Sequence, residues 1–139
     1  MIAKNLDVNV WIFKTDDEYD GRGHASLCVE AVRTIMELRK KKVEMSEAVE
    51  KRLLEVVKRI LPKKGKIAQP SLHRNWDEYM TAFCRFGGVI EAAPPNLNVN
   101  QVKSPSVAFF IEPDSSIKLI GSFDKIPGMD FVNAGCFFP

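Results

Sequence analysis

Hydrophobic positions along this chain follow two different periods, and the change from one to the other predicts where the elements lie. β-Branched and aromatic residues, or apolar residues at every second position, indicate strands, whereas apolar residues three and four apart indicate helices. Strands are predicted over 8–13, 24–29, 89–92, 106–111 and 117–120, helices over 30–41, 46–61 and 75–86, and a short extended segment over 66–71.

Local signals predict several helix boundaries. Ser46 is suited to cap a helix N-terminus, and Glu47 places a carboxylate in its first turn. Asn75 followed by Glu78 forms a similar pair before the next helix. Pro62 is expected to stop the second helix, because proline lacks the backbone N–H and its ring clashes with the preceding turn.

The order of predicted elements is ββααβαβββ, which favours an α+β fold with a largely antiparallel sheet and two to three packed helices. A turn at 112–116, with Pro113 at its second position, is expected to join the last two strands. With 139 residues the chain has the length of one domain. Residues 130–139 are apolar and carry no polar tail, so we expect a chain cut within an element of a longer protein.

Composition narrows the choice of function. Charged residues make up 27% of the chain and the net charge is only +2, which gives no clear nucleic-acid signal. The basic clusters at 39–42 and 58–66 are interpreted as solvated helix ends. Three cysteines without a CxxC motif give no zinc-site spacing, and we expect them to be reduced. The sequence offers neither a signal peptide nor a membrane span, so we expect a cytoplasmic protein.

The stretch WIFKTDDEYDGRGHAS, residues 11–26, contains the closest grouping of charged residues and glycines that could form a binding site. An EF-hand loop starting at Asp16 would place acidic ligands at 16, 18 and 20 and glycine at 21. Its twelfth position would be Leu27, which has no ligating atom, and a strand rather than a helix precedes the loop. We therefore set calcium binding aside.

A strand ending in lysine, then a glycine-bearing turn, then a second strand is one way to hold polyphosphate. Lys14 would supply a positive charge, and Gly21 and Gly23 would let backbone N–H groups approach phosphate oxygens. The sequence has no Walker A motif, and the two glycines are not a dinucleotide fingerprint. The acidic residues of the loop argue against a simple phosphate site, because they repel phosphate unless magnesium intervenes. A surface hairpin turn is therefore an open alternative.

The order of the elements and the amino-acid sequences of three segments resemble those of a known family. The order of elements resembles the central subdomain of the ATP-grasp fold. It begins with a strand that ends in lysine, followed by a glycine loop, a second strand, helices and the segment VIEA. WIFKTDDEYDGRGHA, WDEYMTAFCRFGGVIEAAPP and SVAFFIEPDSSIKLIGSFDKI are similar to the ATP-grasp-like region of the IQ-motif-containing protein H family, over about residues 8–139.

The resemblance implies a site and a division of the chain. Lys14 and the loop Asp20-Gly21-Arg22-Gly23 would cover the phosphates of ATP, and a hinge at Glu91, Ala92 and Ala93 would face adenine. Residues 8–93 would hold the loop, the helices and the hinge, and residues 104–139 would begin the next subdomain. Magnesium would be a second cofactor, and a cilium or flagellum is a possible location. Intact family enzymes activate a carboxylate as an acyl-phosphate for attack by an amine or thiol.

The departures from the family leave catalysis open. Metal-ligand strands of the family would fall beyond Pro139, and Glu112 and Asp114 are interpreted as hairpin-tip residues. No IQ motif occurs, so calmodulin binding by that route is not carried over. A non-catalytic scaffold or interaction domain is the main alternative to nucleotide binding. A calmodulin-target helix over 47–66 ranks third, because its glutamates dilute the basic charge. Trp76, Tyr79 and Phe83 are expected to be core residues rather than an adenine platform.

Overall fold

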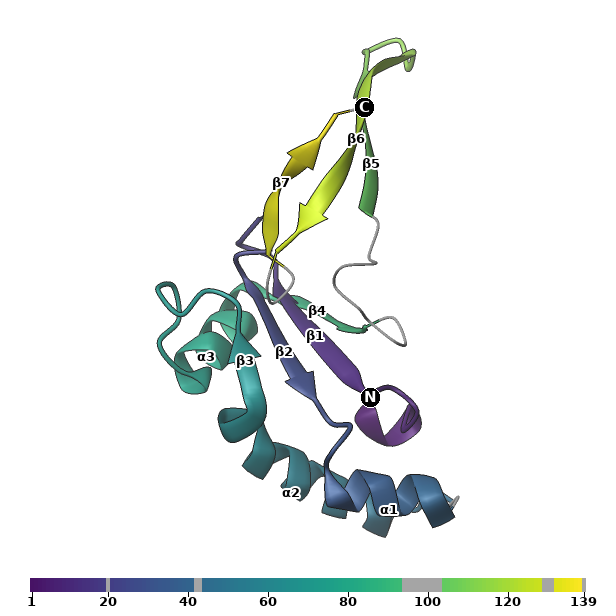
Figure 1. Cartoon of the computed structure of the whole chain (residues 1–139), viewed down its shortest axis with the longest axis vertical. Helices are drawn as coiled ribbons and strands as arrows, with labels where there is room; N and C mark the ends of the chain where they lie inside the picture. The colour runs from purple at the N-terminus through teal and green to yellow at the C-terminus, as the bar shows by residue number, and fades with distance from the viewer. Residues whose placement is uncertain (20, 42–43, 94–103, 129–131, 139) are drawn as a thin grey trace.

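The computed structural model describes residues 1–19, 21–41, 44–93, 104–128 and 132–138. Over these residues the chain forms two antiparallel sheets and three α-helices, which confirms the α+β prediction (Figure 1). Asp20 of the acidic loop and the proline pair 94–95 lie outside the described residues. In chain order the elements are η1 (Ile2–Lys4), β1 (Val10–Thr15), β2 (His24–Cys28), α1 (Arg33–Lys41), α2 (Glu47–Lys64), β3 (Gly65–Ile67), α3 (Trp76–Phe86), β4 (Gly88–Ala92), β5 (Ser104–Ile111), β6 (Ile117–Pro127) and β7 (Asn133–Phe137).

The first sheet has four strands in the order β3-β2-β1-β4. β1 and β2 form the predicted hairpin, with Trp11 opposite Leu27 and Phe13 opposite Ala25. β4 pairs with the other edge of β1. β1 begins two residues later than predicted and continues to Thr15, whose N–H bonds the Gly23 carbonyl across the loop at 3.2 Å. The lysine before the loop therefore lies inside the strand.

The two faces of this sheet have different surroundings. Alternation along β1 sends Trp11 and Phe13 to one face and Ile12 and Lys14 to the other. The first face packs on the helices and forms a buried cluster. That core comprises Trp11, Phe13, Ala25, Leu27, Val29, Val32, Ile35, Leu53, Val56, Trp76 and Tyr79. The opposite face, which we call the Lys14 face, comprises Ile12, Lys14, His24, Ser26, Lys66, Val89 and Glu91.

Both predicted N-caps are present. The Asn75 side chain accepts a hydrogen bond from Glu78 N–H at 2.9 Å, and Glu78 in turn accepts from Arg74 N–H. Ser46 caps α2 by accepting from Val49 N–H at 3.4 Å. These bonds satisfy backbone donors that have no partner within the helix.

Pro62 does not stop α2, contrary to the prediction. The helix continues to Lys64 with the proline inside its last turn. A proline ring fixes φ near the helical value, and only Lys63 and Lys64 follow Pro62 in the helix, so α2 ends within one turn of the proline rather than at it. The helix closes where Gly65 N–H bonds the Leu61 carbonyl.

The second sheet has the order β5-β6-β7 and projects away from the first sheet and its helices (Figure 1). β6 runs to Pro127 rather than ending near residue 120, and β7 follows it as a strand that the periodicity did not predict. β7 contains alanine, glycine and cysteine, so it lacks the β-branched signal of a strand. No helix among the described residues has the length and apolar character needed to cross a membrane.

Candidate functional site

Lys14 and Glu91, predicted separately as phosphate and hinge residues, are in direct contact. Lys14 Nζ lies 2.6 Å from Glu91 Oε1. The register explains the contact, since Glu91 lies opposite Ile12 on the neighbouring strand and Lys14 is two residues further along the same face. The side chains are 36% and 43% exposed. An ion pair this accessible contributes only about 0–1 kcal/mol to stability, so an incoming anion can compete for the lysine.

The structure gives Glu91 a partner that the sequence did not predict. A glutamate in an apolar strand was expected to find its partner in the nucleotide, whereas Lys14 already fills that role. Ala92 lies opposite Trp11 and is turned toward the helix-facing side, away from Lys14. Ala93 is buried, and its N–H donates to the Val10 carbonyl at 2.9 Å.

The glycines of the loop shape its packing. Gly21 has φ of 80°, a conformation that favours glycine. Gly23 is buried, and a Cβ there would lie 2.0 Å from Thr15 Oγ1 and 2.6 Å from Glu18 Cβ. Any other residue at 23 would therefore push the loop away from β1. The expected approach of phosphate to these glycines stays a prediction.

Tyr79 anchors the loop from the core side of the sheet. Its hydroxyl donates to the Gly23 carbonyl at 2.9 Å, and the side chain is fully buried. Burial, with a smaller contribution from the negative charge of Asp17, raises the pKa of Tyr79 above its ordinary value of 10.0. The hydroxyl therefore keeps its proton and remains a donor at neutral pH. Sequence analysis assigned Tyr79 to the core, and only the fold places its hydroxyl beneath the loop.

Arg22 folds back onto its own loop. Its Nε lies 3.8 Å from Glu18 Oε2, and its guanidinium carbon lies 5.6 Å from the centroid of the Tyr19 ring. The Nε atom is buried and has no hydrogen-bond partner among the described residues. Arg22 was predicted as a phosphate contact, and it would have to leave these neighbours to reach one.

Two further side chains share the Lys14 face. His24 lies opposite Lys14 on β2, and Lys66 of β3 lies opposite Ser26. Neither residue was assigned to the candidate site from the sequence. Only the pairing of β3 with β2 brings Lys66 to this face, because it is far from Lys14 along the chain. The face therefore carries two lysines, a histidine and a glutamate.

Other candidate residues have structural roles. Trp76 and Tyr79 are buried, which confirms their core assignment, and Phe13 contacts Trp76 with 5.5 Å between ring centroids. Phe83 is partly buried and packs against this core. Leu53 and Val56 of α2 are also buried in the core, so the apolar positions that a calmodulin-target helix would present are already in use. An apolar groove of about 620 Å³ lies between α2, η1 and the helix-facing side of the sheet, on the opposite side from Lys14.

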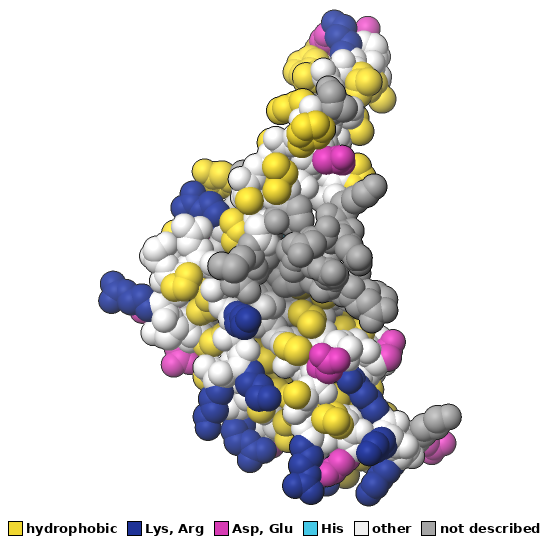
Figure 2. Space-filling model, viewed as in Figure 1, with side chains coloured by type: hydrophobic (Ala, Val, Ile, Leu, Met, Phe, Trp, Pro, Cys, Tyr) yellow, Lys and Arg dark blue, Asp and Glu magenta, His cyan; other side chains and the backbone are white. Residues whose placement is uncertain are grey.

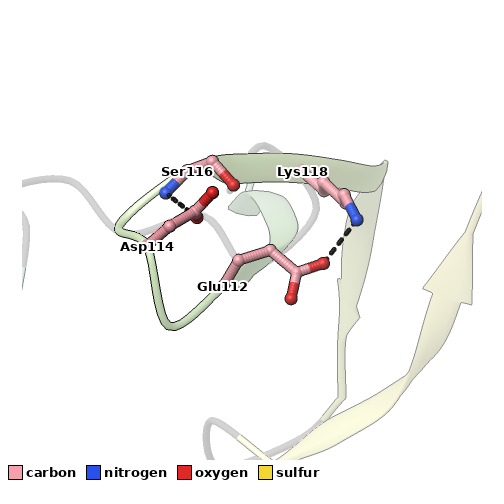
Figure 3. Close-up of polar contacts among 4 residues, drawn as sticks. All are labelled: Glu112, Asp114, Ser116 and Lys118. Carbon is pink, nitrogen blue, oxygen red and sulfur yellow. Dashed lines mark hydrogen bonds and ion pairs between the residues drawn. The ribbon is translucent and has the colours of Figure 1, made fainter.

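Glu112 and Asp114 are hairpin-tip residues, as predicted (Figure 3). Glu112 forms an ion pair with Lys118, and Asp114 accepts a hydrogen bond from Ser116 N–H at 2.9 Å. Hydrogen bonds from the Ser116 side chain and backbone lower the pKa of Asp114. Within the described ranges no group of three or more His, Cys, Asp or Glu residues is arranged to hold a metal ion.

Comparison with known proteins identifies the family. The family model described as "IQCH-like, ATP-grasp" matches residues 1–139. IQ motif-containing protein H of Danio rerio is 25% identical over 150 residues, and the match covers all of this chain and 14% of that relative. No solved structure gives a significant match. Since the model spans the whole chain, the protein belongs to the IQCH-like ATP-grasp family.

Proposed function

We propose that the chain binds ATP on the Lys14 face, with the phosphates at Lys14 and magnesium accompanying them. The observation that carries this proposal is the 2.6 Å contact between Lys14 and Glu91 in a member of an ATP-grasp family. The contact holds a lysine ammonium at the surface, at the end of the sheet where the glycine loop begins. A phosphate oxygen can replace the carboxylate as the partner of this ammonium.

The same face offers an oxygen ligand of the kind that magnesium prefers. Mg²⁺ bound with a nucleotide takes one or two protein carboxylates and completes its shell with phosphate oxygens and water. Glu91 is the carboxylate beside Lys14 and would hold the ion once Lys14 turns to phosphate. Magnesium would also screen phosphate from the acidic residues of the loop. Lys66, on the same face, would add a second positive charge.

Calorimetry of ATP binding with and without magnesium tests this function on the wild-type chain and on Lys14→Ala. We expect binding that requires magnesium and weakens about tenfold or more when Lys14 is lost, as expected for a charge-assisted contact worth about 1.5–3 kcal/mol. Lys118→Ala is the matched control, because Lys118 of β6 also forms an ion pair with a glutamate but lies in the other sheet.

A non-catalytic interaction domain is the second candidate. The observation in its favour is that Lys14 already has an anionic partner, next to a loop rich in carboxylates. This alternative predicts no heat of ATP binding from a folded chain, with or without magnesium. Equal affinity of the Lys14→Ala and wild-type chains would likewise contradict the phosphate role of Lys14.

A further inference from the structure

The projecting sheet has one face that is almost entirely apolar. In β5 and β6, Phe109 lies opposite Leu119 and Ile111 opposite Ile117, and directly paired residues share a face. Val107 joins them because it is two residues before Phe109. Phe137 of β7 lies opposite Asp124, which the register assigns to the same side as Val107. We call this surface the β5–β7 apolar face.

An irregularity in the ladder makes this face continuous. The register shifts between Ala108 and Phe109, where Ile120 is an extra residue on β6. Without the shift, strict alternation along β6 would place Leu119 on the opposite side from Ser122, and half of the apolar set would change faces. The bulge therefore aligns the apolar residues of both strands on one side.

The face is uncovered in the structure. Leu119 is 72% exposed and Ile117 69% exposed, and Val107, Phe109, Ile111 and Phe137 are each more than half exposed. Figure 2 shows hydrophobic side chains gathered over the projecting sheet. A large side chain presents roughly 150–250 Å² when fully open, so this set offers on the order of 600–700 Å². Monomeric soluble proteins rarely expose apolar patches beyond about 300–600 Å².

Charge is distributed so that the face can meet an identical face. Lys118 lies opposite Phe110 and Lys125 opposite Ser104, which places both lysines on the other side of the sheet. Of the residues that the register assigns to the apolar face, the charged one is Asp124, toward its β7 end. Two such faces in contact would bring no row of like charges together. A partner with a charged surface would leave its charges unpaired there.

We propose that the β5–β7 apolar face is a self-association surface, on which a second copy of this chain packs its own β5–β7 face. The area supports this occupant, because a stable interface needs about 800 Å² from each partner and the apolar set supplies most of it. In a dimer with two-fold symmetry the same patch of both copies forms the interface, so the patch has to be complementary only to itself. Two small antiparallel sheets would then stack about 10 Å apart as a sandwich, with both apolar faces inside.

Sedimentation equilibrium of the 139-residue chain tests this proposal between about 1 and 100 μM, since interfaces of this size reach micromolar affinity or better. We expect the wild-type mass to approach twice 15.7 kDa. Leu119→Lys should weaken the dimer by about 100-fold or more, because it buries an unpaired charge between the sheets. Phe110→Lys is the matched control, because Phe110 is also more than half exposed but lies on the other face of the hairpin.

Circular dichroism establishes that each variant is folded, and Ile117→Lys provides a second disruption of the same face. A dimer that both face variants dissociate and Phe110→Lys leaves intact supports the proposal. A wild-type chain that stays monomeric throughout would overturn it, and would leave the face to a different protein or to another part of a longer polypeptide. Association that Leu119→Lys and Phe110→Lys weaken equally, or not at all, would also overturn it.

Discussion

At the scale of single residues, one buried hydroxyl links the core to the candidate phosphate loop. Tyr79 is fully buried and donates to the Gly23 carbonyl, which also accepts from Thr15 N–H. Tyr79→Phe should therefore lower the free energy of unfolding by about 1 kcal/mol, since the carbonyl keeps the N–H and the hydroxyl of Thr15 as donors. Urea denaturation followed by tryptophan fluorescence measures this. Tyr19→Phe, at a side chain 69% exposed, should change nothing measurable, and equal values for the two variants would contradict the anchoring role.

The residues of the site show what a sequence can and cannot predict. Lys14, Gly21 and Gly23 were found because they are neighbours in one loop. The contact of Lys14 with Glu91 joins residues 77 positions apart, and it depends on β1 and β4 pairing in one register. Lys66 reaches the same face through a third strand. Neither contact leaves a periodic signal, so the sequence could point to the loop as a candidate but could not predict which residues of other strands lie beside it.

At the scale of elements, the starts of α2 and α3 were predictable because their capping signals are local, whereas α1 begins at Arg33 rather than at the predicted residue 30. Asn75 caps α3, the helix that carries Trp76 and Tyr79 into the core. Asn75→Ala should cost about 1 kcal/mol in urea denaturation, and Asn75→Asp should retain most of the stability because it keeps the acceptor. Ser46→Ala should cost less, since its bond to Val49 N–H is long at 3.4 Å. A larger loss for Ser46→Ala than for Asn75→Ala would contradict this ranking.

Strand boundaries were less predictable, for reasons that individual elements make clear. β6 continues past residue 120 through Gly121, Ser122 and Asp124, which are weak strand formers. Its pairing with both β5 and β7 holds it extended in spite of that composition. Pro62 gave a strong stop signal, but its effect depends on how many turns follow. In both cases tertiary context decided what local preference left open.

At the scale of the whole molecule, the two sheets differ in how their side chains are buried. β1 lies between two strands and packs on a helical core, whereas most large apolar residues of β5 and β6 are more than half exposed. Local opening costs little free energy where few apolar contacts are lost. The projecting sheet should therefore open more readily than the four-stranded sheet in a dilute monomer.

Hydrogen exchange detected by mass spectrometry checks this difference. In dilute protein we expect the amides of β5 and β6 to exchange at least about tenfold faster than those of β1, equivalent to a gap of about 1.4 kcal/mol or more in opening free energy. If two copies pair through the β5–β7 apolar face, protection of β5 and β6 should rise with protein concentration while that of β1 stays constant. The Leu119→Lys chain should lack the rise, because burial between copies is what stabilises the sheet. Equal protection of both sheets in the monomer would contradict this prediction. It would show that backbone pairing alone stabilises the projecting sheet, with no second copy packed on its apolar face.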